Sequence, residues 1–264
     1  MYDIWVAILL GIVEGLTEFL PVSSTGHLLL FEDMLGFQSP GEVFPVVIQF
    51  GAILSVVAVY GDKFWHVLIN FARDRNARHF VWGVLIAFIP SAILGALLHD
   101  YIKAVLFDPL VVAIALIVGG IAILIVEDRA PKPRYADGDH LPLMKCFQIG
   151  LCQCLALIPG VSRSGATIMG GLLLGVERKA AAEFTFYLAV PTMFGAFVYD
   201  LYKNWSHLTS ADGMLIVIGF VVSFIAAFAV VKTFIAFISR YGFAPFAWYR
   251  IAIGVLIVGL LMAP

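Results

Sequence analysis

Charged residues are scarce in this sequence: Asp, Glu, Lys and Arg make up only 13% of its 264 residues, and their formal sum is −2. Without a basic excess, the chain lacks the electrostatic footprint of a nucleic-acid-binding protein. Cysteine is also scarce. Cys146, Cys152 and Cys154 fit neither a disulfide framework nor a tetrahedral zinc site by number and spacing, so we expect small buried side chains.

Apolar residues are abundant instead of charged ones. The chain is 62% hydrophobic, and its mean hydropathy of +1.00 lies far outside the range of soluble globular proteins. The first twenty residues lack the basic start of a signal peptide, and Glu14 and Glu18 interrupt their apolar run. We therefore expect an integral membrane protein that retains this segment.

Six stretches are long and apolar enough to be transmembrane helices, and two more are apolar but broken. The six are about 43–60, 80–98, 109–126, 184–202, 214–231 and 245–262. The broken stretches, 4–30 and 147–176, carry Pro, Gly and hydroxyl residues in the middle. They are predicted to be re-entrant helix pairs whose tips are buried in protein.

The two broken stretches align with each other. At a constant offset of 139 (162 − 23), the run Ser23-Ser24-Thr25-Gly26 matches Ser162-Arg163-Ser164-Gly165. This predicts a first repeat over 1–127, a cytoplasmic linker over 128–145 and a second repeat over 146–264. Since each repeat has one re-entrant pair and three transmembrane helices, an odd number of crossings, we expect an all-α polytopic membrane protein with an inverted-topology repeat.

The positions of Lys and Arg support that topology. If loops 61–79, 127–145, 177–181 and 232–243 are cytoplasmic, twelve of the sixteen basic residues lie inside and only Lys103 and Lys203 lie outside. Arg250, just within the last helix, is expected to snorkel to the cytoplasmic interface. Both termini are then outside, and the first re-entrant pair opens to the outer face.

Ionisable side chains in the first broken stretch indicate a functional site. Glu14 and Glu18 share a helix face and predict either a carboxylate pair for a divalent cation or an acid/base pair, with a water-exposed helix end as the structural alternative.

Hydroxyls follow these carboxylates. Ser23, Ser24 and Thr25 could surround an anion with hydroxyls and amides, although helix capping is a competing role. His27 follows Ser24 closely enough to act as its base.

The second broken stretch offers a cation instead of carboxylates. Ser162, Arg163 and Ser164 open a helix that also contains Thr167, and a guanidinium beside a helix N-terminus favours phosphate oxygens. Arg163 could instead neutralise one of the glutamates. Gln153 and Leu157 stand where the first repeat has Glu14 and Glu18, so the halves are predicted to have divided the work.

These motifs resemble a known family. EGLTEFLPVSSTGHL and PGVSRSGAT are similar to the two signature stretches of bacterial undecaprenyl-pyrophosphate phosphatases, also called bacitracin resistance proteins, and FPVVIQFGAIL is similar to a third. The resemblance implies a hydrolase that returns a lipid carrier to cell-wall synthesis, acts at the outer side of the bacterial cytoplasmic membrane and needs Mg²⁺ or Ca²⁺. By motif position it points to Glu14, Glu18, Ser24, His27, Ser162, Arg163, Ser164 and Thr167.

The sequence hypothesis assigns a role to each residue. Arg163, with the hydroxyls of Ser23, Thr25, Ser162, Ser164 and Thr167, binds the phosphates. Glu14 and Glu18 hold the metal, and Ser24 is the nucleophile activated by His27, with attack by metal-bound water as an open alternative.

The expected partners are a polyprenyl pyrophosphate and membrane lipid, with no nucleic acid, and the sequence leaves a homodimer open. The alternative function is a polyprenyl-phosphate flippase, alone or combined with hydrolysis, because broken helices in inverted repeats are also typical of transporters.

Overall fold

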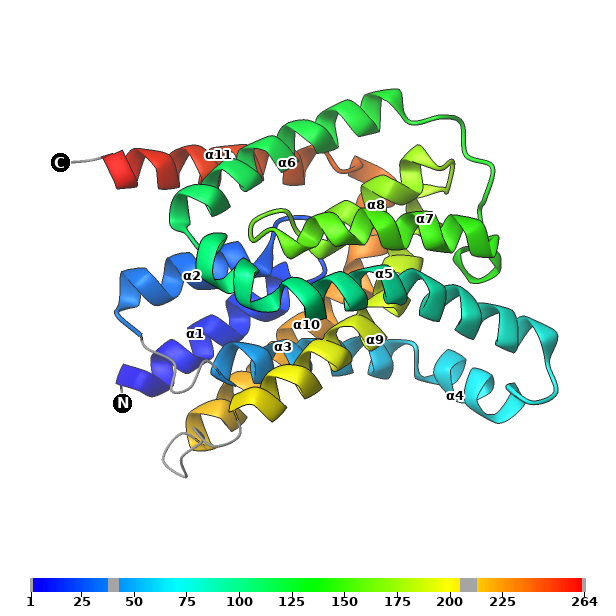
Figure 1. Cartoon of the computed structure of the whole chain (residues 1–264), viewed down its shortest axis with the longest axis horizontal. Coiled ribbons are helices and arrows are strands. Elements are labelled where there is room, and N and C mark those ends of the chain that lie inside the picture. Colours follow the sequence, from blue (N-terminus) through cyan, green and yellow to red (C-terminus); the bar gives the residue numbers. More distant parts are fainter. Residues whose placement is uncertain (1, 38–42, 205–212, 263–264) are drawn as a thin grey trace.

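The computed structural model describes residues 2–37, 43–204 and 213–262, so the outermost ends of the two predicted repeats, residue 1 and residues 263–264, lie outside it. Apart from an isolated bridge between Tyr135 and Val176, the regular structure in these ranges is helical (Figure 1). The helices are α1 (Tyr2–Thr17), α2 (Ser24–Leu35), α3 (Val43–Val59), α4 (Gly61–Asn70), α5 (Arg75–Val105), α6 (Pro109–Arg129), η2 (Gly138–His140), α7 (Leu143–Gln153), η3 (Cys154–Leu157), α8 (Arg163–Leu173), α9 (Arg178–Asn204), α10 (Gly213–Tyr241) and α11 (Ala244–Met262).

Five helices are long and apolar enough to cross a membrane by length and composition: α5, α6, α9, α10 and α11. A sixth span results if α3 and α4, which meet at a bend of 75°, are taken together. The all-α polytopic fold predicted from the sequence is therefore confirmed. Helices α5, α6, α9, α10 and α11 overlap five of the six predicted stretches, and α3 overlaps the remaining one, 43–60. Long helices of 31 residues in α5 and 29 in α10 also absorb parts of the predicted loops.

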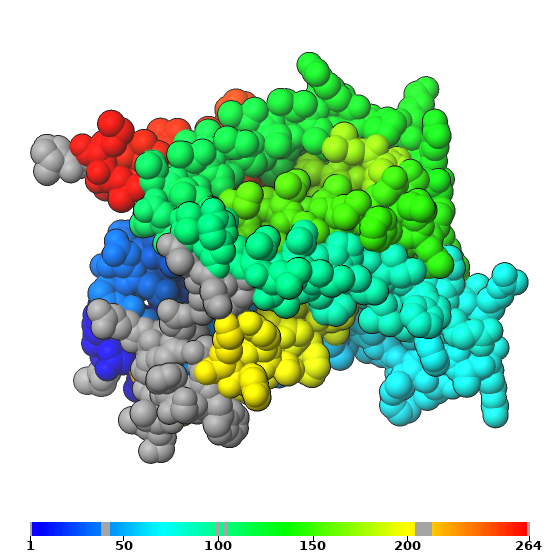
Figure 2. All heavy atoms as spheres, in the orientation of Figure 1, coloured from blue at the N-terminus to red at the C-terminus, as the bar shows by residue number. Residues whose placement is uncertain are grey.

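Helix α4 lies within the loop predicted over 61–79 and was not expected. None of its residues is buried, and Trp65, Leu68 and Ile69 are exposed. Its side chains project at the edge of the molecule (Figure 2, cyan). A short helix with exposed aromatic and aliphatic residues beside a membrane span is typical of a segment lying in the membrane interface.

Each broken stretch forms a helix pair with a turn between its arms. Helix α1 packs on α10, α7 packs on α5, and α3 with α9 and α6 with α11 form further contacts, so the two halves interleave. Gly11 in α1 and Gly150 in α7, aligned by the offset of 139, both lie where a Cβ would collide with a carbonyl of the helix they pack on. This matched packing supports the predicted duplication; the inverted orientation and the repeat limits remain predictions.

The turn after α1 is anchored in the main core. Phe19 is fully buried and packs edge to face on Phe186 of α9, with ring centroids 5.5 Å apart. The guanidinium of Arg163 lies 5.8 Å from the centre of the same ring. Phe19 thus fixes the residue beside it, Glu18, against the second half of the chain.

Candidate active site

Two turns position the chemistry: the first tip, residues 18–23 between α1 and α2, and the second tip, residues 158–162 between η3 and α8. Each ends in a serine with left-handed φ, 70° at Ser23 and 75° at Ser162, the two non-glycine residues with positive φ in the described ranges. Each serine oxygen accepts a hydrogen bond from an amide three residues on, at Gly26 (3.4 Å) and Gly165 (3.1 Å). Ser23 therefore takes the capping role that was the alternative for the first hydroxyl run, and Ser162 caps α8 in the same way.

This strained backbone places functional side chains at two helix starts. A non-glycine residue at such φ costs about 1–3 kcal/mol and persists where its surroundings impose it. The residue after each capping serine, Ser24 or Arg163, is the first residue of its helix. The two occupy the same position in the aligned halves.

Glu18 connects these two residues. The Ser24 hydroxyl donates to Glu18 Oε2, and Arg163 Nη2 donates to Glu18 Oε1 at 3.1 Å. The Glu18 and Arg163 side chains are only 5% and 11% exposed. A buried ion pair is favourable when further hydrogen bonds satisfy it. Arg163 Nη1 supplies one by donating to Thr185 O at 3.0 Å.

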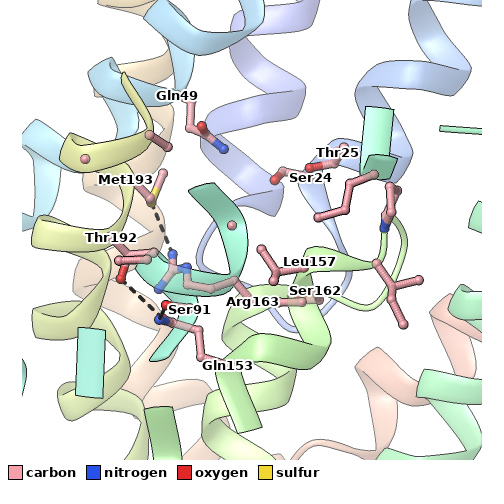
Figure 3. A pocket seen from close by; sticks show the side chains of 18 of the residues that line it. Ser24, Thr25, Gln49, Ser91, Gln153, Leu157, Ser162, Arg163, Thr192 and Met193 are labelled. Carbon is pink, nitrogen blue, oxygen red and sulfur yellow. Dashed lines mark hydrogen bonds between the residues drawn. The ribbon is translucent and has the colours of Figure 1, made fainter. Parts of the chain in front are cut away.

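The linked residues line a cavity of about 440 Å³. Figure 3 shows Ser24 and Arg163 reaching into it from different helices. Arg163 Nε is buried and has no hydrogen-bond partner within the described residues, so one donor remains for a ligand. The rest of the wall is largely apolar and includes Phe88, Ala92, Ile102, Phe107 and Leu157. A cavity with a polar end and an apolar wall suits an amphiphile.

A neutral polar cluster lies on the same wall, where Gln153, the counterpart of Glu14, contacts two hydroxyls that the sequence did not predict. Gln153 Nε2 donates to the Ser91 hydroxyl, and the Thr192 hydroxyl donates to Gln153 Oε1 at 3.4 Å (Figure 3). Ser91 and Thr192 each follow a proline inside a membrane helix, Pro90 and Pro191. A polar residue beside an intrahelical proline is the signal that could have identified them.

Six of the ten predicted site residues line the cavity: Glu18, Ser23, Ser24, Thr25, Ser162 and Arg163. Ser164 and Thr167 do not. The Ser164 hydroxyl donates to Leu20 O at 2.7 Å and so joins the tips. The Thr167 hydroxyl donates to Arg163 O at 2.9 Å and accepts from Thr185. Their bonds stay within the protein, which favours a supporting role over phosphate contact.

His27 also lies off the cavity wall, and the expected pairing with Ser24 is wrong for this conformation. His27 Nδ1 donates to Ser23 O at 2.7 Å, and Nε2 lies 2.7 Å from the hydroxyl of Tyr249 in α11. Because both ring nitrogens are engaged, Glu18 and not His27 is placed to receive the Ser24 proton.

Glu14 is one of the two residues predicted to hold a metal ion. It is fully buried, and apart from the neighbouring Glu18 carboxyl no hydrogen-bonding group among the described residues reaches its carboxyl oxygens. Two adjacent buried carboxyls need a proton or a cation between them, so the donor set fits a cation. No cluster of three His, Cys, Asp or Glu able to hold a metal occurs in residues 2–37, 43–204 and 213–262. A cation here would take further ligands from phosphate oxygens, as Mg²⁺ commonly does.

The expectation that Arg250 snorkels to the interface is wrong. Its side chain is 1% exposed and points between the tips and α6, where it donates only to backbone carbonyls. Gly119 and Gly120 of α6 leave the space that it occupies. The sequence signal for this burial was a pair of adjacent glycines in one apolar helix, α6, together with a single arginine in another, α11.

Comparison with known proteins gives consistent matches along the chain. A family model described as "Bacitracin resistance protein BacA" matches residues 7–256. "Undecaprenyl-diphosphatase 1" of Mesorhizobium japonicum is 54% identical over 255 residues, 96% of this chain and 94% of that protein. "Undecaprenyl-diphosphatase" of Caulobacter vibrioides is 52% identical over 265 residues and covers 100% of both chains. The similarity therefore spans both tips and all six candidate spans.

Proposed function

The chain belongs to the bacitracin resistance protein BacA family, and we propose from this membership and from the site that it is a membrane-embedded undecaprenyl-diphosphatase. It hydrolyses undecaprenyl diphosphate to undecaprenyl phosphate and inorganic phosphate. The observation that carries the proposal is the buried chain Ser24–Glu18–Arg163 at the polar end of the cavity. It joins a hydroxyl, a proton acceptor and a cation in one place.

The cavity accounts for an amphiphilic substrate. The diphosphate lies at the polar end, where Arg163 and the capped N-termini of α2 and α8 favour negative charge. The prenyl chain follows the apolar wall between α5 and α9 toward lipid. Arg163 Nε, which lacks a protein partner in the described ranges, donates to a phosphate oxygen.

The proposed chemistry begins at Ser24. Glu18 takes the hydroxyl proton, and the Ser24 oxygen attacks the terminal phosphorus. The bond from that phosphorus to the bridging oxygen breaks, and undecaprenyl phosphate leaves with the bond's electrons. Water then hydrolyses the phosphoserine, which releases phosphate and restores the hydroxyl, and Glu18 gives up its proton to the solvent. Arg163 stabilises the charge that develops on the phosphoryl oxygens.

A divalent cation, Mg²⁺ or Ca²⁺, is proposed as cofactor, with Glu14 and Glu18 as its protein ligands. When bound it would neutralise phosphate charge and could activate water directly, which is the second route to hydrolysis. The unpartnered Glu14 oxygens support its presence.

The proposed setting is the bacterial cytoplasmic membrane, with both termini on the outer side and the first re-entrant pair opening to that side. The sidedness rests on the distribution of basic residues. Helix α1 begins, and helix α11 ends, at the same end of the molecule (Figure 1), as this topology requires. At that face the enzyme recycles the lipid carrier for peptidoglycan synthesis and thereby supports resistance to bacitracin.

The test is phosphate release from undecaprenyl diphosphate by purified protein in detergent, with and without a chelator. Wild type is expected to release phosphate, the chelator to suppress release, and Arg163→Ala to abolish it. A flippase without hydrolase activity would release none, so a wild type that binds the lipid without releasing phosphate contradicts the proposal.

A further inference from the structure

Arg250 uses every donor that it has. A guanidinium carries five N–H bonds, and all five find backbone carbonyls here. Nε donates to Leu116 O (3.3 Å), Nη1 to Pro21 O (3.1 Å) and Val161 O (2.9 Å), and Nη2 to Ala115 O (3.1 Å) and Gly160 O (2.9 Å). No donor remains for a substrate, and no ion pair with Arg250 occurs within the described residues.

The carbonyls that it binds lie at both tips. Pro21 precedes the strained Ser23 by two residues, and Gly160 and Val161 directly precede the strained Ser162. One nitrogen, Nη1, bridges the first tip to the second. The neighbouring residue Tyr249 hydrogen-bonds to His27, whose other ring nitrogen donates to Ser23 O at the end of the first tip. Side chains of a single helix, α11, therefore bind both tips.

We infer that Arg250 is a positioning residue that sets the two tips in register and so aligns Ser24, Glu18 and Arg163. A left-handed φ at serine persists only where its surroundings fix it, and Arg250 fixes the chain entering both such residues. Misplacement of a reactive group by about 1 Å can cost about 10²-fold in rate. The inference rests on the proposed function, because it explains how that site is assembled.

Geometry, and not charge alone, is required of this residue. Lysine has three donors on one nitrogen and cannot reach five carbonyls spread over α6 and two tips. Helix α6, which is the last predicted crossing of the first repeat as α11 is of the second, carries no charged residue from Pro109 to Val126. One guanidinium thus serves both halves, and α6 has no charged side chain in this range that could replace it.

Gly119 offers a way to move the guanidinium without removing it. A Cβ at Gly119 would collide with Arg250 Nη2, whereas a Cβ at Gly259 in α11 would meet nothing within 4 Å. Gly119→Ala therefore displaces the head group, and Gly259→Ala is the matched control. Arg250→Lys keeps the charge and tests the loss of the planar guanidinium with its five donors.

The experiment compares wild type and these three variants in detergent, with initial rates over a range of undecaprenyl diphosphate concentrations. Gel filtration and thermal unfolding give the folded fraction. Since Arg250 does not touch substrate, kcat is expected to fall about 100-fold in Arg250→Lys and about 10-fold in Gly119→Ala, with KM changed less than about threefold. Gly259→Ala should retain kcat within about twofold of wild type.

Several results would overturn the inference. One is a wild-type kcat per folded molecule in both Arg250→Lys and Gly119→Ala, which would leave Arg250 a stability role alone. Another is a rise in KM at constant kcat, which would mean direct substrate contact. If Arg250→Lys does not fold, Gly119→Ala decides by the same criteria. A wild type without phosphate release would overturn the proposed function, and this inference with it.

Discussion

The first and second tips share a backbone and differ in chemistry. Each has a capping serine with positive φ followed by a helix, and Ser24 and Arg163 occupy the same first position. The first tip supplies a hydroxyl there and the second a guanidinium, while Glu18, whose counterpart is Leu157, bonds to both. A duplicated scaffold thus provides two helix starts at one cavity, and exchange of side chains at matched positions produces the division of labour.

The largest expected effect is loss of the cation from the second tip. Arg163→Ala leaves Glu18 buried without its partner and removes the charge that stabilises the phosphoryl group, so phosphate release should fall about 10³-fold. Arg240→Ala, a change at an exposed arginine in the last turn of α10, is the control and should be silent. Activity of Arg163→Ala within tenfold of wild type would remove the second tip from the mechanism.

Removal of the nucleophile from the first tip is expected to rank next. Ser24→Ala should lower phosphate release about 10²- to 10³-fold and abolish a trappable phosphoenzyme. The measurement is acid trapping after addition of substrate labelled in its terminal phosphate. Ser239→Ala, whose hydroxyl bonds only to its own helix, is the control. Rapid turnover by Ser24→Ala would favour attack by metal-activated water.

A smaller effect is expected when the first half is made like the second at Glu14. Glu14→Gln installs the residue type found at Gln153, so it removes one charge while preserving shape. We expect about a tenfold loss of activity together with a higher Mg²⁺ concentration for half-maximal rate. The check is a Mg²⁺ titration of both proteins. An unchanged Mg²⁺ requirement would remove Glu14 from the cation site.

The smallest effect is expected behind the second tip. The Thr167 hydroxyl bonds to Arg163 O and Thr185 and does not line the cavity. Thr167→Val should therefore keep KM within about threefold and lower the free energy of unfolding by about 1 kcal/mol. Steady-state kinetics and thermal unfolding measure the two quantities. A tenfold rise in KM would instead place Thr167 in the phosphate clamp.

Sequence patterns predicted the features that depend on local composition. The six apolar spans, the broken segments and the motif positions of Ser24, Glu18 and Arg163 all follow from hydropathy and punctuation by Pro and Gly. Sequence patterns did not predict the partners that lie far apart in the chain. The bonds from Tyr249 to His27 and from Arg250 to Pro21 join residues more than two hundred positions apart. Those from Arg250 to the second tip join residues eighty-nine and ninety positions apart.

The same limit explains the error at His27. Its spacing from Ser24 suggested a base and a nucleophile, but the rigid turn directs the ring nitrogens to Ser23 O and Tyr249. The carboxylate that does contact Ser24 lies six residues before it, across the broken helix. Helical spacing rules do not extend through such a break.

The central claim is that Glu18 joins the tips into one catalytic unit, and a double-mutant cycle tests it most directly. The measurement is kcat/KM for phosphate release by wild type, Glu18→Gln, Arg163→Gln and the double variant. If the residues act as a unit, the double variant should be no slower than the slower single variant to within about threefold. If the two losses multiply instead, Glu18 and Arg163 act independently, and the linked two-tip site is contradicted.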